Sequence, residues 1–245
     1  MTTISGNQRV LVTGASRGIG RAAMRYLAAA GYQVTGLART IPKDIEPHEH
    51  FVACDLMDLD ATRQVLAQLA DGRPFYGLVN NAALAHTTDL AHTSVADMNE
   101  AMTLNVNASL VCMQELLPGM TGAKAGRVVN ISSRAALGKP NRTAYSATKA
   151  AVIGMSRTWA LELAPHGITV NVIAPGPVAT ELFKQASPPD APQTKALLAA
   201  VPLQRVSEPE EIAHAIAFLL HPLSGYITGQ TLHIDGGLTI SATRI

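Results

Sequence analysis

Seven short apolar segments alternate with longer amphipathic segments along the 245 residues, and this alternation limits the possible folds more than any other feature of the chain. The apolar segments are rich in Val and Ile and have no polar face, which is typical of strands covered on both sides of a sheet. They occupy 9–14, 32–38, 50–55, 75–81, 126–132, 168–175 and 230–237. Helical patterns lie between them, near 19–30, 59–70, 95–120, 143–164 and 209–220.

Repeated alternation of strand and helix predicts a parallel sheet with right-handed crossovers. We therefore expect an α/β fold, with a single Rossmann-type domain over residues 1–245. Its seven-stranded sheet should be doubly wound and mostly parallel, with helices on both faces. The stretch 175–206 contains six prolines and is too long for an ordinary connection, so we predict a substrate lid at about 180–206.

Composition excludes several classes of protein. The net charge is +1 and only 15% of residues are charged, so we expect no nucleic-acid partner. No apolar run is long enough to cross a bilayer and no signal peptide is apparent, so we expect a cytoplasmic protein without membrane contact. Cys54 and Cys112 are interpreted as buried thiols in a reducing compartment. The eight histidines form no ligand pattern, so we expect no metal site.

A glycine-rich turn, TGASRGIG at 13–20, lies between the first strand and the first helix. Gly14, Gly18 and Gly20 would let the backbone turn tightly and approach a pyrophosphate at the helix N-terminus. The glycine spacing is GxxxGxG, not GxGxxG. The prediction of a nucleotide site therefore depends largely on the position of the turn directly after an apolar strand. The sequence therefore predicts a site for a dinucleotide.

Residues at the end of the second strand indicate which nicotinamide cofactor is bound. NAD sites usually have an acidic residue there, which binds the ribose 2′-hydroxyl. Here the strand ends in Leu37-Ala38-Arg39-Thr40, without an acid. Arg39, together with Arg17 in the glycine turn, could bind a 2′-phosphate through charge-assisted hydrogen bonds. NADP(H) is therefore favoured over NAD(H).

Tyr145 and Lys149, in the run AYSATK, share one face of a helix. A free phenol has a pKa of about 10 and exchanges protons poorly at neutral pH. An ammonium group beside the phenol would favour the phenolate and lower that pKa. Tyr145 would then be able to give a proton to a carbonyl oxygen, or take one from an alcohol, near pH 7. The pair predicts an oxidoreductase of carbonyls and alcohols.

In motif order and content the chain resembles the short-chain dehydrogenase/reductase family, and within it the 3-oxoacyl-ACP reductase-like group. The matching motifs span nearly the whole chain: TGASRGIG, CDL at 54–56, NNA at 80–82, LNV at 104–106, NISS at 130–133, Tyr145-x-x-x-Lys149, PGPVAT at 175–180 and ITGQTLHIDGG at 227–237. One departure is Ala83, where the family usually has Gly.

The resemblance implies catalytic roles for Ser133, Tyr145, Lys149 and Asn105. Tyr145 matches the proton donor, Lys149 the group that tunes it and holds the nicotinamide ribose, and Asn105 the residue that holds a water in a proton relay. The cofactor-binding residues implied by the same motifs are Gly14, Ser16, Arg17, Gly18, Ile19, Gly20, Arg39, Asp55, Leu56, Asn81, Ala82, Tyr145, Lys149, Pro175, Gly176, Val178 and Thr180.

The position of the catalytic serine is open between two neighbours. Tyr145 follows Ser133 by 12 positions and Ser132 by 13, and the family commonly has the longer spacing. The second serine of NISS motifs usually points into the cleft, so we favour Ser133 and place a deletion in the loop 134–142. Ser132 remains the alternative.

The substrate is poorly specified by the sequence. The resemblance implies a ketone and a secondary alcohol, with a 3-oxoacyl thioester linked to acyl carrier protein or CoA as one candidate. In relatives that bind the acidic acyl carrier protein, basic residues lie beside the entrance to the site. At the corresponding positions this chain has only Lys124 and His166, so the sequence gives little support for binding of the carrier. The alternative is a small free alcohol, sugar, polyol or steroid, and a remote alternative is a non-catalytic NADP-binding sensor. The resemblance also implies a homotetramer.

Overall fold

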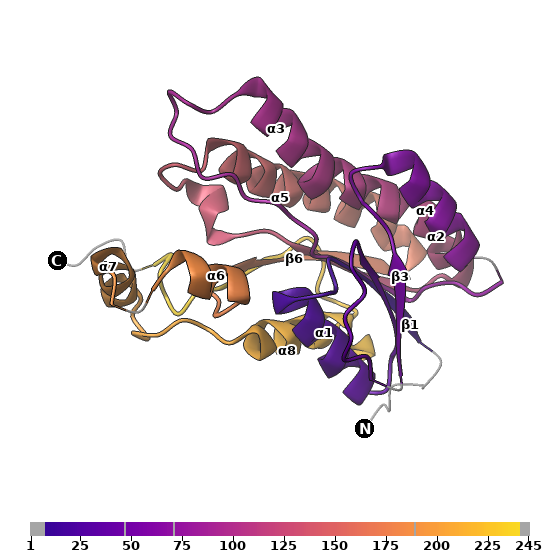
Figure 1. Ribbon diagram of the computed structural model, residues 1–245. Coiled ribbons are helices and arrows are strands. Elements are labelled where there is room, and N and C mark those ends of the chain that lie inside the picture. The colour runs from indigo at the N-terminus through magenta and orange to yellow at the C-terminus, as the bar shows by residue number, and fades with distance from the viewer. Residues whose placement is uncertain (1–7, 47, 71, 189, 241–245) are drawn as a thin grey trace.

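Seven strands form one parallel sheet in the order β3-β2-β1-β4-β5-β6-β7 (Figure 1). The structure is a computed structural model that describes residues 8–46, 48–70, 72–188 and 190–240. The strands are β1 (Arg9–Thr13), β2 (Gln33–Ala38), β3 (Glu49–Ala53), β4 (Gly77–Asn80), β5 (Gly126–Ile131), β6 (Ile168–Pro175) and β7 (Thr231–Ile234). The predicted α/β sheet is confirmed, and every pairing in it is parallel.

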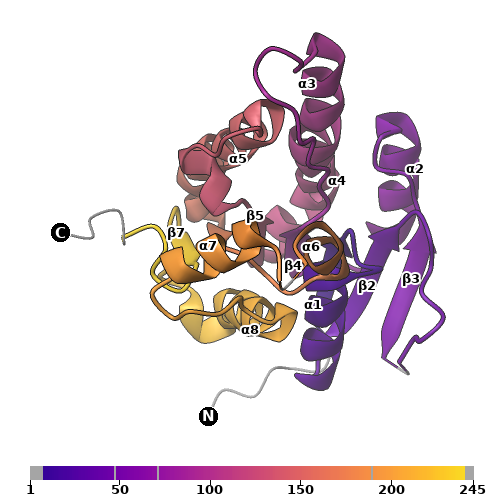
Figure 2. The same cartoon turned by 60° about the vertical axis from the view of Figure 1, so that its left-hand side comes forward.

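Helices cover both faces of the sheet (Figure 2). One face packs against α1 (Gly18–Ala29) and α8 (Pro209–Leu220), around the buried residues Met24, Leu27 and Ile216. The opposite face packs against α2 (Leu59–Ala70), α4 (Ala108–Ala123) and α5 (Thr143–Leu163). Because both faces are covered, β4, β5 and β6 are buried along their whole length, which explains why their sequences show no polar alternation.

Strand order reverses between β1 and β4, because the chain first builds β2 and β3 on one side of β1 and then continues on the other. In open α/β sheets this reversal opens a crevice beyond the carboxyl ends of the strands. The glycine turn after β1 and the NNA motif after β4 both start at this crevice. The fold therefore brings two of the predicted motifs together.

The predicted helix over 95–120 is interrupted. It consists of α3 (Val95–Met102), a π-helical turn (Thr103–Asn107) and α4. Ser94 begins α3 with a capping box, in which its hydroxyl accepts from the Asp97 N–H. The prediction of one continuous helix was wrong at its centre, where Asn105 lies.

The predicted lid contains two helices, α6 (Glu181–Ala186) and α7 (Pro192–Ala200), which Figure 1 shows beyond the carboxyl edge of the sheet. Pro189, one of the six prolines in the stretch, lies outside the described residues. Short 3₁₀ turns cover Arg134–Leu137, Ala164–His166 and Pro222–Ser224. No helix within the described part of the chain is long and apolar enough to cross a membrane.

A buried polar network crosses the centre of the sheet. The Asn80 amide donates to the Asn130 side-chain oxygen at 2.8 Å, and the Asn130 amide donates to the Ser156 hydroxyl at 2.8 Å. Asn80, Asn130 and Ser156 are all buried. The network ties the carboxyl ends of β4 and β5 to α5, so these asparagines have a structural role.

We expect Asn130→Ala to lower the free energy of unfolding by about 2–3 kcal/mol, because two buried hydrogen bonds are lost and the partners are left unpaired. The measurement is the urea unfolding midpoint. Asn99→Ala is the matched control, because Asn99 is exposed on α3 and should change stability by less than about 0.5 kcal/mol. An unchanged midpoint for Asn130→Ala would contradict the structural role.

Candidate active site

The glycine turn after β1 favours glycine at three of its positions. Gly14 and Gly18 have φ of 64° and 54°, in the left-handed region. At Gly20 a Cβ would lie 2.2 Å from the Gly14 carbonyl oxygen, which is closer than real contacts allow. The spacing GxxxGxG therefore follows from the packing of the turn against itself.

The N-terminus of α1 has the features of an anion site. Arg17 precedes the helix with an extended backbone and forms no side-chain cap, and the described first turn contains no acidic residue. Its backbone N–H groups and the positive end of the helix dipole are thus available to a diphosphate. A Cβ on Gly18 would meet the Thr180 methyl at 3.0 Å, so the turn and the start of the lid approach closely. These residues fit a dinucleotide.

Asn81 fastens the glycine turn to β4. Its amide donates to the carbonyl oxygens of Thr13 at 3.0 Å and Gly14 at 3.1 Å. The Thr13 hydroxyl in turn accepts from the backbone N–H groups of Asn81 and Ala82. Asn81 and Ala82 therefore border the turn, and the side chain of Asn81 supports it from the protein side.

The predicted residues for the adenosine half lie at the ends of β2 and β3. Arg17 and Arg39 are exposed, and neither forms an ion pair with a described residue. The glycine turn is tied to the end of β2 by the bond from the Ala15 N–H to the Leu37 carbonyl. Asp55 is exposed, with its carboxylate accepting from the Met57 N–H at 3.1 Å. Leu56 is buried in the core, which leaves its backbone to face a ligand.

The structure separates the two candidate serines. Ser132 is buried, and its hydroxyl donates to the Lys149 carbonyl at 2.7 Å. The side chain of Ser133 accepts from the Ala135 N–H at 3.1 Å and lies close enough to the Tyr145 phenol to lower its pKa. Ser132 therefore fastens β5 to α5, whereas Ser133 lies beside the phenol.

Lys149 is fully enclosed near Tyr145. Its ammonium donates to the Ile131 carbonyl at 2.7 Å and lies 5.7 Å from the centre of the Tyr145 ring. Burial lowers the pKa of Lys149 to about 8, because the charged form is poorly solvated there. The lysine can thus exchange a proton close to physiological pH.

Burial raises the pKa of Tyr145, and this effect exceeds the lowering by the Ser133 hydrogen bond and by the positive charge of Arg142. The sequence predicted the opposite direction, on the assumption that the Lys149 ammonium lies against the phenol oxygen. In the structure that ammonium is directed to the Ile131 carbonyl. Ser133 and Arg142 are the groups of this chain that favour the phenolate.

Asn105 connects the π-helical turn to a loop beside the site. Its amide donates to the Leu84 carbonyl at 3.0 Å and to the Thr148 hydroxyl at 2.9 Å, and its oxygen accepts from the Leu84 N–H at 2.9 Å. The side chain is therefore occupied by protein partners. Thr148 was missed by sequence reasoning, although its position immediately before Lys149 places it on the helix turn that carries the site.

Two loop segments, 84–90 and 134–142, are joined to each other. The Thr88 N–H donates to the Asn141 carbonyl at 3.1 Å. Arg142 donates to the carbonyls of Ala85 at 3.2 Å and His86 at 3.3 Å. The His86 imidazole lies 3.0 Å from the Glu100 carboxylate. Sequence reasoning also missed Arg142 as the residue that holds this loop.

The PGPVAT motif forms the opposite side of the crevice. Gly176 packs against Asp235, since a Cβ there would lie 2.8 Å from the Asp235 Cα. Val178 is buried and pairs with Ser207, which closes the lid segment at its base. Thr180 caps α6 by accepting from the Phe183 N–H at 3.2 Å. Pro175 is the last residue of β6, so the motif starts at the carboxyl edge of the sheet.

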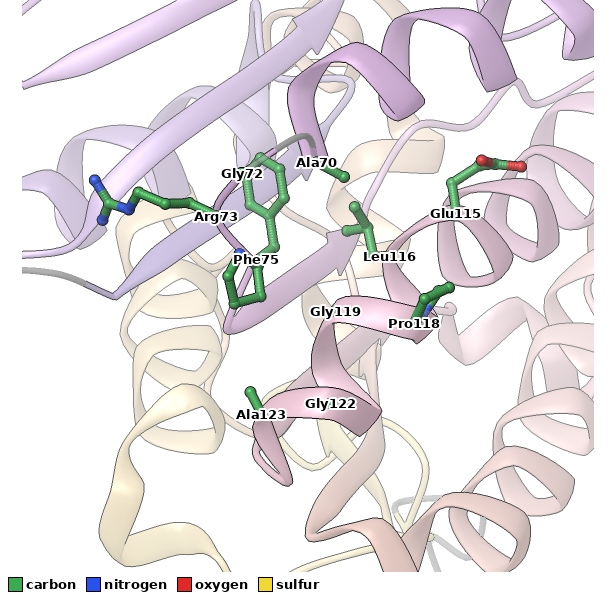
Figure 3. A pocket seen from close by; sticks show the side chains of 11 residues that line it. Ala70, Gly72, Arg73, Phe75, Glu115, Leu116, Pro118, Gly119, Gly122 and Ala123 are labelled. Carbon is green, nitrogen blue, oxygen red and sulfur yellow. The ribbon is translucent and has the colours of Figure 1, made fainter.

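Two cavities lie away from these residues. One, of about 370 Å³, is lined by Arg73, Phe75 and Glu115 at the amino end of β4 (Figure 3). The other, of about 460 Å³, lies between α1 and α8. Neither borders Ser133 or Tyr145, so the site is identified by its side chains and not by cavity volume. Among the described residues no group of three or more potential metal ligands is present.

The comparisons with known proteins agree with this geometry. The sequence profile of the family described as enoyl-(acyl carrier protein) reductase matches residues 14–239. The 3-oxoacyl-[acyl-carrier-protein] reductase of Synechocystis sp. is 35% identical over 246 residues, covering 95% of this chain and 97% of that protein.

Two solved structures are also similar. Aldohexose dehydrogenase of Thermoplasma acidophilum in ligand-free form has a TM-score of 0.90 at 28% identity, over 98% of this chain and 96% of that one. A putative NAD(P)-dependent gluconate 5-dehydrogenase of Beutenbergia cavernae, with NADP bound at low occupancy, has a TM-score of 0.87 at 31% identity. The match covers 95% of this chain and 97% of that chain. The chain belongs to the short-chain dehydrogenase/reductase family and is an oxidoreductase acting on CH–OH donors.

Because the pKa of Lys149 is lowered from 10.5 to about 8, the folded protein binds fewer protons than the unfolded chain between these two values. The free energy of unfolding therefore rises with pH in this window. We expect Lys149→Met to remove that rise, so that the stability of the variant relative to the parent falls by up to about 3 kcal/mol from pH 7 to pH 11. Denaturant midpoints across this pH range measure it, and parallel pH profiles for the two proteins would contradict it.

Proposed function

We propose that this chain is an NADP(H)-dependent oxidoreductase that interconverts a ketone and a secondary alcohol, with Ser133, Tyr145, Lys149 and Asn105 as its catalytic residues. The observation that carries the proposal is the proximity of the Ser133 and Tyr145 side chains beside the buried Lys149, whose ammonium lies 5.7 Å from the centre of the Tyr145 ring. This group lies at the carboxyl ends of the strands, on the same edge as the glycine turn. No simpler structural role explains a buried ammonium next to a phenol–hydroxyl pair.

The residues present would hold the cofactor along the crevice. The diphosphate would lie over the turn formed by Gly14, Ser16, Gly18, Ile19 and Gly20, the adenosine half near Arg17, Arg39, Asp55 and Leu56, and the nicotinamide half near Asn81, Ala82, Tyr145, Lys149, Pro175, Gly176, Val178 and Thr180. When bound, the nicotinamide supplies or accepts the hydride. NADP(H) is favoured because Arg17 and Arg39 are exposed and available to a 2′-phosphate.

The chain itself handles the proton and the carbonyl oxygen. Ser133 and Tyr145 donate hydrogen bonds to that oxygen, and Tyr145 gives its proton as negative charge develops there. Lys149, with a pKa of about 8, supplies a proton toward the tyrosine. The side chain of Asn105 is taken by Leu84 and Thr148, so a water in the relay would be held by the Asn105 main-chain carbonyl.

Two substrate classes have support from similar proteins. The relatives named 3-oxoacyl-[acyl-carrier-protein] reductase favour a 3-oxoacyl thioester carried by acyl carrier protein or CoA. The structural neighbours named aldohexose dehydrogenase and gluconate 5-dehydrogenase favour a sugar or sugar acid. A non-catalytic sensor remains the remote alternative, which the presence of all four catalytic residues disfavours.

We also propose a homotetramer, a lid at about 180–206 that covers the substrate, and a cytoplasmic location. Large apolar side chains are exposed beside the edge strand β7, namely Phe218, Leu223, Tyr226 and Leu232, which supports an interface there. The helices α6 and α7 lie at the carboxyl edge, where a lid is needed. Cys54 and Cys112 are both buried free thiols, which suits a reducing compartment.

We expect Tyr145→Phe to lower the turnover number by about 100-fold or more, because the general acid is removed while the ring and its packing remain. The assay is NADPH oxidation with acetoacetyl-CoA and with a panel of small ketones and keto sugars. Tyr26→Phe is the control, because Tyr26 lies on α1, where its hydroxyl contacts His214 away from Ser133.

The serine assignment is tested in the same assay. Ser133→Ala should lower turnover strongly and stability by about 1 kcal/mol, through loss of the cap to the Ala135 N–H. Ser132→Ala should lower stability through loss of its buried bond to Lys149 and leave the Ser133 hydroxyl in place. Near-parental turnover of Tyr145→Phe, or no turnover of any carbonyl by the parent enzyme, would overturn the proposed function.

We expect Arg39→Ala to raise the KM for NADPH by about 10-fold or more and to change the KM for NADH much less, because one charge-assisted hydrogen bond to the 2′-phosphate is lost. The two KM values give the cofactor preference. Arg73→Ala, which removes the same charge at the amino end of β4, is the control. A parental preference for NADH would contradict the cofactor assignment.

A further inference from the structure

The segment between the proposed catalytic serine and tyrosine is basic. Residues 134–144 contain Arg134, Lys139 and Arg142 and no acidic residue. Elsewhere in the chain, Arg21, Arg25, Arg63 and Arg205 each pair with a carboxylate.

Two of the three cations lack protein partners. Arg134 and Lys139 form no hydrogen bond and no ion pair with any residue that the structure describes. Arg134 is nevertheless half-buried, and it directly follows Ser133 at the start of a 3₁₀ turn. Arg142 differs, because its guanidinium donates to the carbonyls of Ala85 and His86. It holds the loop 84–90 in place, and Arg134 and Lys139 remain available to a ligand.

The three charges are close enough to act on one another and on the site. The pKa of Lys139 is lowered by burial and then by the positive charges of Arg142 and Arg134, and no acidic residue offsets this. The charge of Arg142 also acts on the Tyr145 phenol, whose pKa it lowers. The positive potential therefore extends from the rim of the site to the group that would bind the carbonyl oxygen.

The start of α5 adds to this potential. Arg142 precedes the helix without a side-chain cap, and the described first turn of α5 contains no acid. The positive end of the dipole of this 21-residue helix thus faces the same segment as the cations. An anionic substrate would compensate the charges of Arg134 and Lys139, which no described carboxylate does.

We propose that the substrate of this oxidoreductase is an anion, whose carboxylate or phosphate group is bound by Arg134 and Lys139 while its carbonyl oxygen lies between Ser133 and Tyr145. This inference rests on the proposed function and narrows its substrate class. Two sources of the anionic group fit: the carboxylate of a small oxo acid, and the phosphates of a pantetheine-linked thioester. Arg142 is a positioning residue, because it acts through the loop 84–90.

The test compares charged and uncharged derivatives of the same acetoacetyl group. The pairs are acetoacetate with methyl acetoacetate, and acetoacetyl-CoA with the uncharged N-acetylcysteamine thioester of acetoacetate. We expect kcat/KM of the parent enzyme to favour the charged member of at least one pair by about tenfold or more, since one charge-assisted contact contributes at least this factor. The pair that shows the preference identifies the carboxylate or the phosphate as the source.

Variants then assign the preference to residues. Arg134→Gln and Lys139→Gln should each lower kcat/KM for the charged substrate by about tenfold, mainly through KM. For the neutral substrate, each variant should lower kcat/KM by about twofold or less. Arg73→Gln makes the same change of charge at the opposite edge of the sheet and should alter neither value. Equal losses on both members of a pair, or no preference in the parent, would overturn the proposal.

A binding measurement keeps the inference separate from the proposed function. Isothermal titration of 3-hydroxybutanoate and of coenzyme A into the parent enzyme, Arg134→Gln and Lys139→Gln requires no turnover. Weaker binding of either ligand to both variants would support the anion site even if no ketone were reduced. Equal binding by all three proteins would refute the anion site even if ketones were reduced well.

Discussion

The reciprocal pair of hydrogen bonds between β5 and α5 determines the geometry of the whole site. The Ser132 hydroxyl donates to the Lys149 carbonyl, and the Lys149 ammonium donates back to the Ile131 carbonyl, both at 2.7 Å. Because the bonds run in opposite directions between the same strand and helix, neither element can slide past the other. Ser133 follows β5 and Tyr145 lies on α5, so these two contacts also fix the separation of the Ser133 and Tyr145 side chains.

The sheet and most helices could be predicted because their signals are local: apolar runs mark the strands and amphipathic runs mark the helices. The lid helix α7 was missed because prolines were taken as a sign of irregular structure, although Pro192 occupies the first helical position, where proline is favoured. The π-helical turn at 103–107 was missed for another reason. Its hydrogen-bond pattern depends on the contacts of Asn105 with Leu84 and Thr148, which are distant in the sequence.

At the site, residue types and motif order predicted which side chains meet, but not how their charges are balanced. Neighbouring serines alternate across a strand, yet only the bonds to Lys149 and Tyr145 distinguish Ser132 from Ser133. The direction of the Tyr145 pKa shift was wrong, because burial and the orientation of the lysine are tertiary properties. The sequence did not indicate an anion site at Arg134 and Lys139. Only the three-dimensional structure shows that neither cation pairs with an acidic residue among those described.

The π-helical turn also has a consequence for how this part of the chain can evolve. Each residue of an α-helix turns the chain by about 100°, so a register defect cannot be created or removed by exchanging side chains. Loss of one residue within 103–107 would rotate Asn105 away from the loop 84–90 or swing the buried face of α4, with Cys112 and Leu116, out of the core. The attachment of the loop 84–90 is therefore sensitive to changes of length in the π-helical turn as well as to substitution of Asn105. In related proteins we therefore expect the residues of the loop 84–90 to vary, while the number of residues in the π-helical turn stays the same.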